Sequence, residues 1–184
     1  MMIKKFAAAF AALALTAGAH ATAVTVDSSE QATDASVSGT FTTGTAGNGL
    51  LEFNLNGFAS LDGQNFYEDD FSLAVNGTTV YVGTFNLGGG GANVTYTNTD
   101  GATYTQTGSQ TLSFIAPVSL AAGSNTFTFS YFSLDDANHA GFQGTGDEGW
   151  GVSNVAVVPE PASLALMLAG LGVVGGLARR RRQA

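Results

Sequence analysis

Apolar and polar residues alternate through the middle of the chain. The segments 51–55 and 71–75 each carry an apolar side chain at every second position, which places these side chains on one face of a strand. Phe127, Phe129 and Tyr131 follow the same rule and are expected to anchor the core of a sheet. No helix-length apolar period occurs in this region, so the pattern predicts strands.

One turn signal lies between two of these alternating segments. Asn76-Gly77 separates 71–75 from the apolar and β-branched segment 78–85. Both residues tolerate the positive φ angles that a tight two-residue hairpin requires. The sequence therefore predicts a hairpin at this position.

Further turn residues divide the rest of the region. Thr99-Asp100-Gly101 predicts a second hairpin, between strands at 93–98 and 102–107. A strand over 111–116 is expected to stop at Pro117, because proline cannot donate a backbone hydrogen bond.

The pattern as a whole predicts about eight to ten short strands with regular turn signals. We therefore expect an all-β fold, an antiparallel β-sandwich that is jelly-roll-like. Two segments, 120–127 and 147–155, resemble the penultimate hairpin and the closing strand of carbohydrate-binding-type jelly rolls. Alternation continues over 150–157, directly before a proline-rich segment.

The N-terminal segment has the composition of an export signal. Lys4-Lys5 precedes an apolar stretch at 6–15, and Ala19 and Ala21 supply the small residues of a cleavage site. This order is typical of a secretory signal peptide, with cleavage before Thr22.

The last 26 residues combine three features in a fixed order. Pro159-Glu160-Pro161 precedes an uncharged apolar run at 162–178, which four arginines at 179–182 follow directly. As a helix, the 17-residue apolar run would measure about 25 Å, the short end of what spans a bilayer. By the positive-inside rule the arginines lie on the cytoplasmic side, which leaves the preceding region outside.

This C-terminal arrangement, together with the export signal, resembles the PEP-CTERM sorting-domain proteins of Gram-negative bacteria. The residues that carry the resemblance are Pro159, Glu160, Pro161, Arg179, Arg180, Arg181 and Arg182. The resemblance implies transient anchoring in the inner membrane, and processing near the Pro-Glu-Pro segment by an exosortase-type membrane protease. It implies nothing definite about the region between the two ends, since members of the family carry unrelated middles.

The chain therefore divides into three parts: a signal peptide over 1–21, a β-sandwich domain over 22–157 and a sorting signal over 158–184. All six basic residues lie in the terminal parts, whereas thirteen of the fourteen acids lie in 22–158, which gives this region a formal charge of −13. Such a domain does not attract nucleic acid, whose binding depends on cationic side chains. Its buried carboxylates must rely on hydrogen bonds, a metal ion or protonation.

The acids form short clusters near apparent strand ends. Calcium prefers six to eight oxygen ligands and tolerates the irregular geometry of loops, so a calcium ion is one partner for these carboxylates. Carbohydrate-binding jelly rolls commonly hold a structural calcium near their last strand, and the resemblance places Asp147 and Glu148 there. The candidate ligands are Asp135, Asp136, Asp147 and Glu148. The alternative is that the carboxylates only keep the surface soluble and the sheet edges unpaired.

Aromatic residues near polar loops offer a flat platform for sugar rings. The candidates are Phe66, Tyr67, Phe142 and Trp150, although alternating aromatics in strands are also typical of a core. Evidence for an enzyme is weaker. The chain has no cysteine, and His139 is the one histidine after the signal peptide, without a nucleophile-elbow motif. Carboxylate pairs suit glycoside hydrolysis, yet any acidic domain contains such pairs.

The sequence thus predicts a non-enzymatic exported protein of the cell surface or of an exopolysaccharide or biofilm matrix. A calcium-dependent carbohydrate-binding or adhesion module is the alternative, and a secreted hydrolase comes third.

Overall fold

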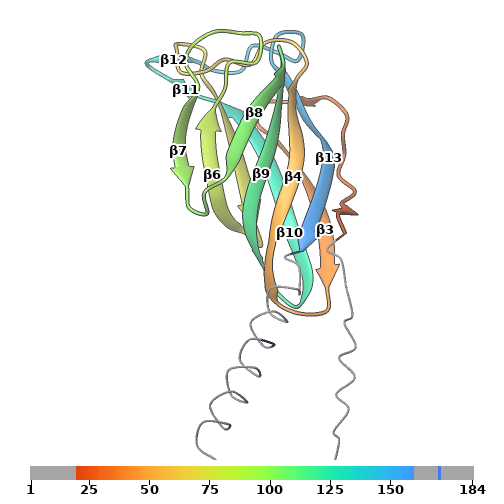
Figure 1. Ribbon diagram of the computed structural model, residues 1–184. Coiled ribbons are helices and arrows are strands. Elements are labelled where there is room, and N and C mark those ends of the chain that lie inside the picture. Colours follow the sequence, from red (N-terminus) through yellow and green to blue (C-terminus); the bar gives the residue numbers. More distant parts are fainter. Residues whose placement is uncertain (1–19, 160–169, 171–184) are drawn as a thin grey trace, which may run out of the picture. The chain divides into compact units, whose positions relative to one another are not determined.

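The computed structural model describes residues 20–159 and residue 170. Between residues 20 and 159 it contains strands and no helix (Figure 1). The six-stranded sheet contains β1 (Thr22–Ala23), β2 (Gln31–Ala32), β4 (Gly47–Gly57), β8 (Thr103–Gly108), β9 (Thr111–Leu120) and β13 (Gly149–Pro159). The five-stranded sheet contains β3 (Ala35–Thr43), β5 (Asp69–Val75), β6 (Thr78–Thr84), β7 (Val94–Asn98) and β10 (Gly123–Ser133). A small ribbon consists of β11 (Asp135–Asp136) and β12 (His139–Ala140).

Every strand pairing in these sheets is antiparallel. In the first sheet β1 and β2 both pair with β13, and β4, β9 and β8 follow in that order. The second sheet has the order β3-β10-β5-β6-β7. These pairings confirm the predicted all-β, antiparallel β-sandwich.

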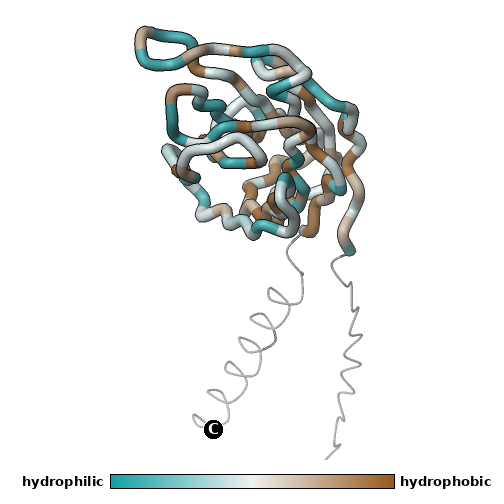
Figure 2. The backbone as a smooth tube through the Cα atoms, turned by 90° about the horizontal axis from the view of Figure 1, so that it is seen from above, coloured by the Kyte–Doolittle hydropathy of each residue, from teal (hydrophilic) through white to brown (hydrophobic). Residues whose placement is uncertain are grey.

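The core lies between the two sheets and is largely aromatic. Along β4 and β10, alternate side chains point inward and are buried, as the apolar alternation predicted. The Phe53 ring stacks on Phe114 of the neighbouring strand and meets Phe129 of the opposite sheet edge-on, both at 4.9 Å between centroids. Hydrophobic and hydrophilic positions alternate along the backbone of the sandwich (Figure 2).

The hairpin predicted at Asn76-Gly77 is confirmed. Asn76 and Gly77 have φ angles of 50° and 80°, and they connect β5 to β6, which pair directly. The positive φ at both central positions is the geometry that an Asn-Gly turn supplies.

The second predicted hairpin is wrong. The strands on either side of residues 99–102 belong to different sheets, because β7 pairs with β6 and β8 pairs with β9. The Asn98 side chain fixes this crossing by accepting from the Ala102 N–H at 2.7 Å and donating to the Ala102 carbonyl at 2.9 Å. Gly101 has a φ of 76°, so the sequence correctly predicted a turn at this position. Such a signal does not tell a hairpin from a crossing between layers.

The predicted stop at Pro117 is also wrong, since β9 continues to Leu120. Pro117 lies opposite Leu50 of β4, while β8 on the other side begins at Thr103, opposite Ile115. At Pro117 the strand therefore has a neighbour on one side only, where sheets tolerate proline.

The described chain enters and leaves the sandwich at the same end. Thr22 pairs with Val157 and Ala23 with Ala156, while Pro159 lies opposite Gly49 at the start of β4. The long loops 58–68 and 134–148 lie at the other end (Figure 1).

The predicted signal peptide and transmembrane helix fall outside the described residues, apart from positions 20, 21 and 170. Among the residues that the structure describes, no helix is long and apolar enough to cross a membrane.

Candidate functional site at the acidic end of the sandwich

Four carboxylic acid side chains are buried at the loop end of the sandwich, which we call the acidic end: Glu68, Asp69, Asp70 and Glu148. Residues 20–159 contain no lysine or arginine that could pair with them. Because successive residues of a strand face opposite sides of a sheet, Asp69 and Asp70 at the start of β5 belong to different surroundings. The acidic end therefore contains an inner and an outer carboxyl cluster.

The inner carboxyl cluster consists of Asp69, Glu148 and the hydroxyl of Ser133. The Ser133 Oγ lies 2.5 Å from Asp69 Oδ1 and 3.2 Å from Glu148 Oε2. A hydroxyl donates only one hydrogen, so it satisfies one of these carboxylates. A proton on the other carboxyl group would supply the second hydrogen bond, and the Thr33 hydroxyl also lies 2.8 Å from Ser133 Oγ.

Burial changes the acidity of this inner cluster. It raises the pKa of Asp69 to about 7, against hydrogen bonds from the Asp62 N–H and Ser133, and the nearby Glu148 charge adds to the rise. Burial also raises the pKa of Glu148, although the Gln143 N–H donates to it at 2.8 Å. Desolvation disfavours the charged form of a carboxyl group, so part of this cluster is protonated near neutral pH.

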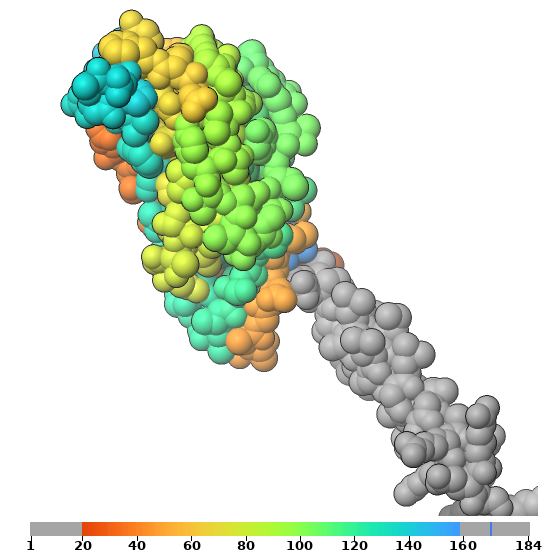
Figure 3. Space-filling view, turned by 90° about the vertical axis from the view of Figure 1, so that its left-hand side faces the viewer, coloured from red at the N-terminus to blue at the C-terminus, as the bar shows by residue number. Residues whose placement is uncertain are grey.

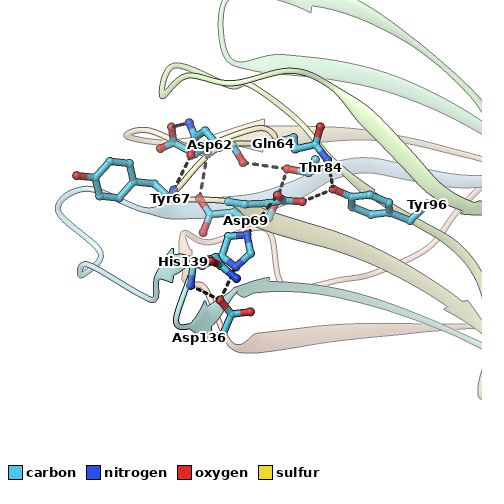
Figure 4. A network of polar contacts seen from close by, with 11 residues as sticks. Asp62, Gln64, Tyr67, Asp69, Thr84, Tyr96, Asp136 and His139 are labelled. Carbon is cyan, nitrogen blue, oxygen red and sulfur yellow. Dashed lines mark hydrogen bonds and ion pairs between the residues drawn. The ribbon is translucent and has the colours of Figure 1, made fainter.

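The outer carboxyl cluster contains Glu68, Asp70, Tyr96 and His139 (Figure 4 shows its setting). The Tyr96 hydroxyl donates to Glu68, and His139 Nε2 lies 3.8 Å from Glu68 Oε2. His139 is held in place by Asp136, whose Oδ1 lies 2.8 Å from Nδ1. A β-bulge in the β6–β7 pairing brings Tyr96 here, since the register shifts beside it.

Asp70 is the least satisfied member of the outer cluster. It is only 6% exposed, and its Oδ1 atom has no hydrogen-bond partner among the described residues. Burial, followed by the repulsion of Glu68, raises the pKa of Asp70 to about 7, while His139 acts in the opposite direction. Near neutral pH, Asp70 therefore titrates between a neutral and a charged state.

The four residues that the sequence predicted as calcium ligands lie in different surroundings in the structure. Asp135 and Asp136 are exposed on β11, Asp147 accepts a hydrogen bond from Ser60 Oγ at 3.0 Å, and Glu148 belongs to the inner cluster. In the described part of the chain, no three His, Asp or Glu side chains are grouped so that they could hold a metal ion. Calcium binding by these four residues stays a prediction.

The aromatic residues that were predicted to form a sugar platform differ in their exposure. Phe66, Tyr67 and Phe142 are exposed, and the rings of Phe66 and Tyr67 meet edge-on at 5.2 Å. The loops that carry them lie side by side, since the Ala140 N–H donates to the Phe66 carbonyl (Figure 3). Trp150 was wrong as a platform residue, because its ring is fully buried and its Nε1 donates to the Ala32 carbonyl at 2.7 Å.

The sequence did not identify Tyr96 or Asp62 as part of this end. Tyr96 reaches it through a bulge, and Asp62 contributes through its backbone N–H, which donates to Asp69 Oδ2 at 3.0 Å. The bulge has no signal in a single sequence, because it depends on how β6 pairs with β7, and the Asp62 contact depends on the path of the loop before β5.

Comparison with known proteins adds one specific match. The family model of the PEP-CTERM protein-sorting motif matches residues 157–182. No curated protein sequence matches the chain.

Several solved structures match the chain at low identity and low TM-score. A family 35 carbohydrate binding module from an environmental isolate has 14% identity and a TM-score of 0.35, covering 79% of this chain and 85% of that one. A family 35 module from Clostridium thermocellum has 16% identity and a TM-score of 0.31, covering 74% of this chain and 92% of that one. Similarity at this level says nothing about a ligand of this chain.

The matched segment begins in β13, so the sandwich continues directly into the sorting motif. Such a motif indicates export with a membrane-anchored sorting signal, and it implies processing by exosortase, a membrane protein. The chain therefore carries a PEP-CTERM protein-sorting motif at residues 157–182, with an antiparallel β-sandwich in front of it.

Proposed function

We propose that the β-sandwich is a non-catalytic module displayed outside the cell, at the surface or within an exopolysaccharide matrix. The observation that carries this proposal is the continuity of the last strand with the sorting motif, which share residues 157–159. Because β13 ends on the side of the sandwich away from the acidic end, the acidic loops are free to meet extracellular material while the sorting motif is engaged.

Mass spectrometry of the released protein tests this proposal. We expect an N-terminus at Thr22 and a product that lacks residues 179–182. A variant with Pro159 and Pro161 replaced by alanine is expected to stay in the membrane fraction with its arginines intact. A released wild-type protein that still carries Arg179–Arg182 contradicts the proposal.

A second candidate function is calcium-dependent binding of carbohydrate or adhesion at the acidic end. The exposed rings of Phe66, Tyr67 and Phe142 favour it, because they lie on the loops of the acidic end and present apolar faces to solvent. Retention on a polysaccharide resin that EDTA abolishes and added calcium restores supports this function. Retention that is insensitive to EDTA contradicts the calcium requirement.

An assay for released reducing ends tests the proposal that the module is non-catalytic. Incubation of the purified protein with the retained polysaccharide is expected to release no reducing ends. Release that disappears in the Glu68→Gln or Asp70→Asn variant would instead make the outer carboxyl cluster a hydrolytic site.

A further inference from the structure

A shallow groove of about 530 Å³ lies on the six-stranded sheet, between β4, β13 and the turn that joins β8 to β9. Its lining consists of hydroxyl, amide and glycine residues with a single aromatic ring, that of Phe58, and includes no charged side chain. This composition stands out in a domain that carries thirteen acids.

The floor of the groove is a fixed array of hydrogen-bonding groups. The Asn56 amide donates to Ser153 Oγ at 3.0 Å and accepts from Thr111 Oγ1 at 3.3 Å. These contacts hold the amide plane and leave its second N–H hydrogen available. The Ser153 hydroxyl, which accepts from Asn56, keeps its own hydrogen for a ligand.

The aromatic wall is equally fixed. Phe58 is 47% exposed, and its backbone N–H donates to the Gly149 carbonyl at 2.8 Å. Its ring lies against Gly151, where an added Cβ atom would come within 2.8 Å of Phe58 Cε2. Glycine at this position therefore lets the ring lie close to the sheet, with the rest of the ring facing solvent.

A row of uncharged polar residues extends from the groove across the sheet. The strand register places Thr105, Ser113, Asn54 and Ser153 side by side on β8, β9, β4 and β13. Four neighbouring strands span roughly 14 Å. The next row contains Glu52 and the exposed Ile115, which ends the neutral band.

We propose that this groove binds a neutral polysaccharide chain, which crosses the strands and places one sugar ring against Phe58. Sugar rings offer an apolar face to an aromatic ring and many hydroxyl groups to amides and hydroxyls. An acidic polymer is disfavoured, since the domain is strongly negative. This inference rests on the proposed extracellular function for the presence of the ligand, but it does not involve calcium or the acidic end.

Affinity electrophoresis of the purified full-length protein in detergent tests the site. The gels contain xylan, galactomannan or a β-1,3-glucan, with alginate as the acidic comparison. We expect retardation by at least one neutral polymer, unchanged by EDTA. The Phe58→Ala variant is expected to bind about tenfold more weakly, as loss of one aromatic contact implies. Phe58→Tyr is expected to retain binding.

Leu50→Ala serves as the matched control, since Leu50 is also an exposed large apolar residue on β4 but lies outside the groove lining. Its binding is expected to equal that of the wild type. Should Phe58→Ala fail to fold, Ser153→Ala tests the floor of the same groove, with weaker binding expected.

Three results overturn the inference: no retardation by any neutral polymer, wild-type affinity in Phe58→Ala, or loss of binding in Leu50→Ala or with EDTA. The assay uses purified protein, so it does not depend on export. A failure of sorting appears only in the mass spectrum of the released protein, and the two failures are therefore separate results.

Discussion

At the scale of single residues, the domain is shaped by carboxyl groups that lack basic partners. Asp70 shows this most clearly, because its buried Oδ1 has no hydrogen-bond partner within the described part of the chain and Glu68 lies beside it. A buried charge without a partner costs free energy, so the ionised form of Asp70 destabilises the fold.

This cost predicts that Asp70→Asn stabilises the protein at pH 8. The amide has the shape of the acid without its charge, and we expect the free energy of unfolding to rise by about 1 kcal/mol after allowance for solvent screening. Chemical denaturation at pH 8 measures the change. Asp135→Asn, at an exposed position on β11, is the matched control and is expected to have no effect.

A lower stability of Asp70→Asn at pH 8 contradicts this account. If that loss occurs only when calcium is present, the charged carboxylate is instead a cation ligand.

At the scale of strands and turns, local sequence patterns predicted where strands and turns lie, but not which strands pair with each other. Alternation identified β5 and β10, and the Asn-Gly signal identified the turn between β5 and β6, because both properties depend on neighbouring residues. The crossing at 99–102 was missed, since its two strands pair with segments elsewhere in the chain. β3 also went unassigned, because one of its inward positions is Gly39, which carries no apolar side chain.

The same limit applies to the candidate site. The acid clusters were visible in the sequence, but register decides that Asp69 faces Ser133 while Asp70 faces outward beside Glu68. Register was also needed to align the neutral row that includes Asn54 and Ser153, which no local motif marks.

A buried asparagine connects two turns at the opposite end of the sandwich. Asn125 Oδ1 accepts from the Ala121 N–H at 2.8 Å and from Asn76 Nδ2 at 2.9 Å, and its Nδ2 donates to the Ala121 carbonyl at 2.9 Å. Asn76 in turn accepts from the Thr126 N–H. The side chain thus fixes both the β9–β10 and the β5–β6 connections.

We therefore predict that Asn125→Ala lowers the free energy of unfolding by about 2 to 3 kcal/mol, because it leaves buried polar groups without partners. Urea denaturation measures the loss. Asn48→Ala, at an exposed position of β4, is expected to change stability by less than about 0.5 kcal/mol. Equal effects of the two substitutions would show that the connection between the turns is unimportant.

At the scale of the whole molecule, the uniformly negative charge and the buried carboxyl groups both destabilise the fold as the pH rises. The formal charge of −13 over 22–158 is not offset by any basic residue there. Asp69 and Asp70 both have pKa values raised to about 7 from an ordinary 3.8, and Glu148 has a raised pKa as well. Protonation therefore relieves the repulsion and the cost of burial together.

The sign of the resulting pH dependence follows from proton linkage. A carboxyl group with a raised pKa in the fold binds more protons there than in the unfolded chain. The stability that it contributes is fully present below pH 4 and is lost as the pH rises through about 7. From pH 5 to pH 8, we expect the free energy of unfolding to fall by about 2 kcal/mol, after solvent screening is allowed for.

Thermal and urea denaturation between pH 5 and pH 8 measure this fall, and salt separates its two causes. In 1 M salt the screening length is about 3 Å, so repulsion between distant surface charges is largely removed whereas the cost of burying Asp69 and Asp70 remains. The pH dependence is therefore expected to persist in 1 M salt and to weaken in the Asp69→Asn/Asp70→Asn double variant. If the slope instead disappears in high salt and survives in the double variant, surface repulsion controls the stability of this domain and the buried carboxyls do not.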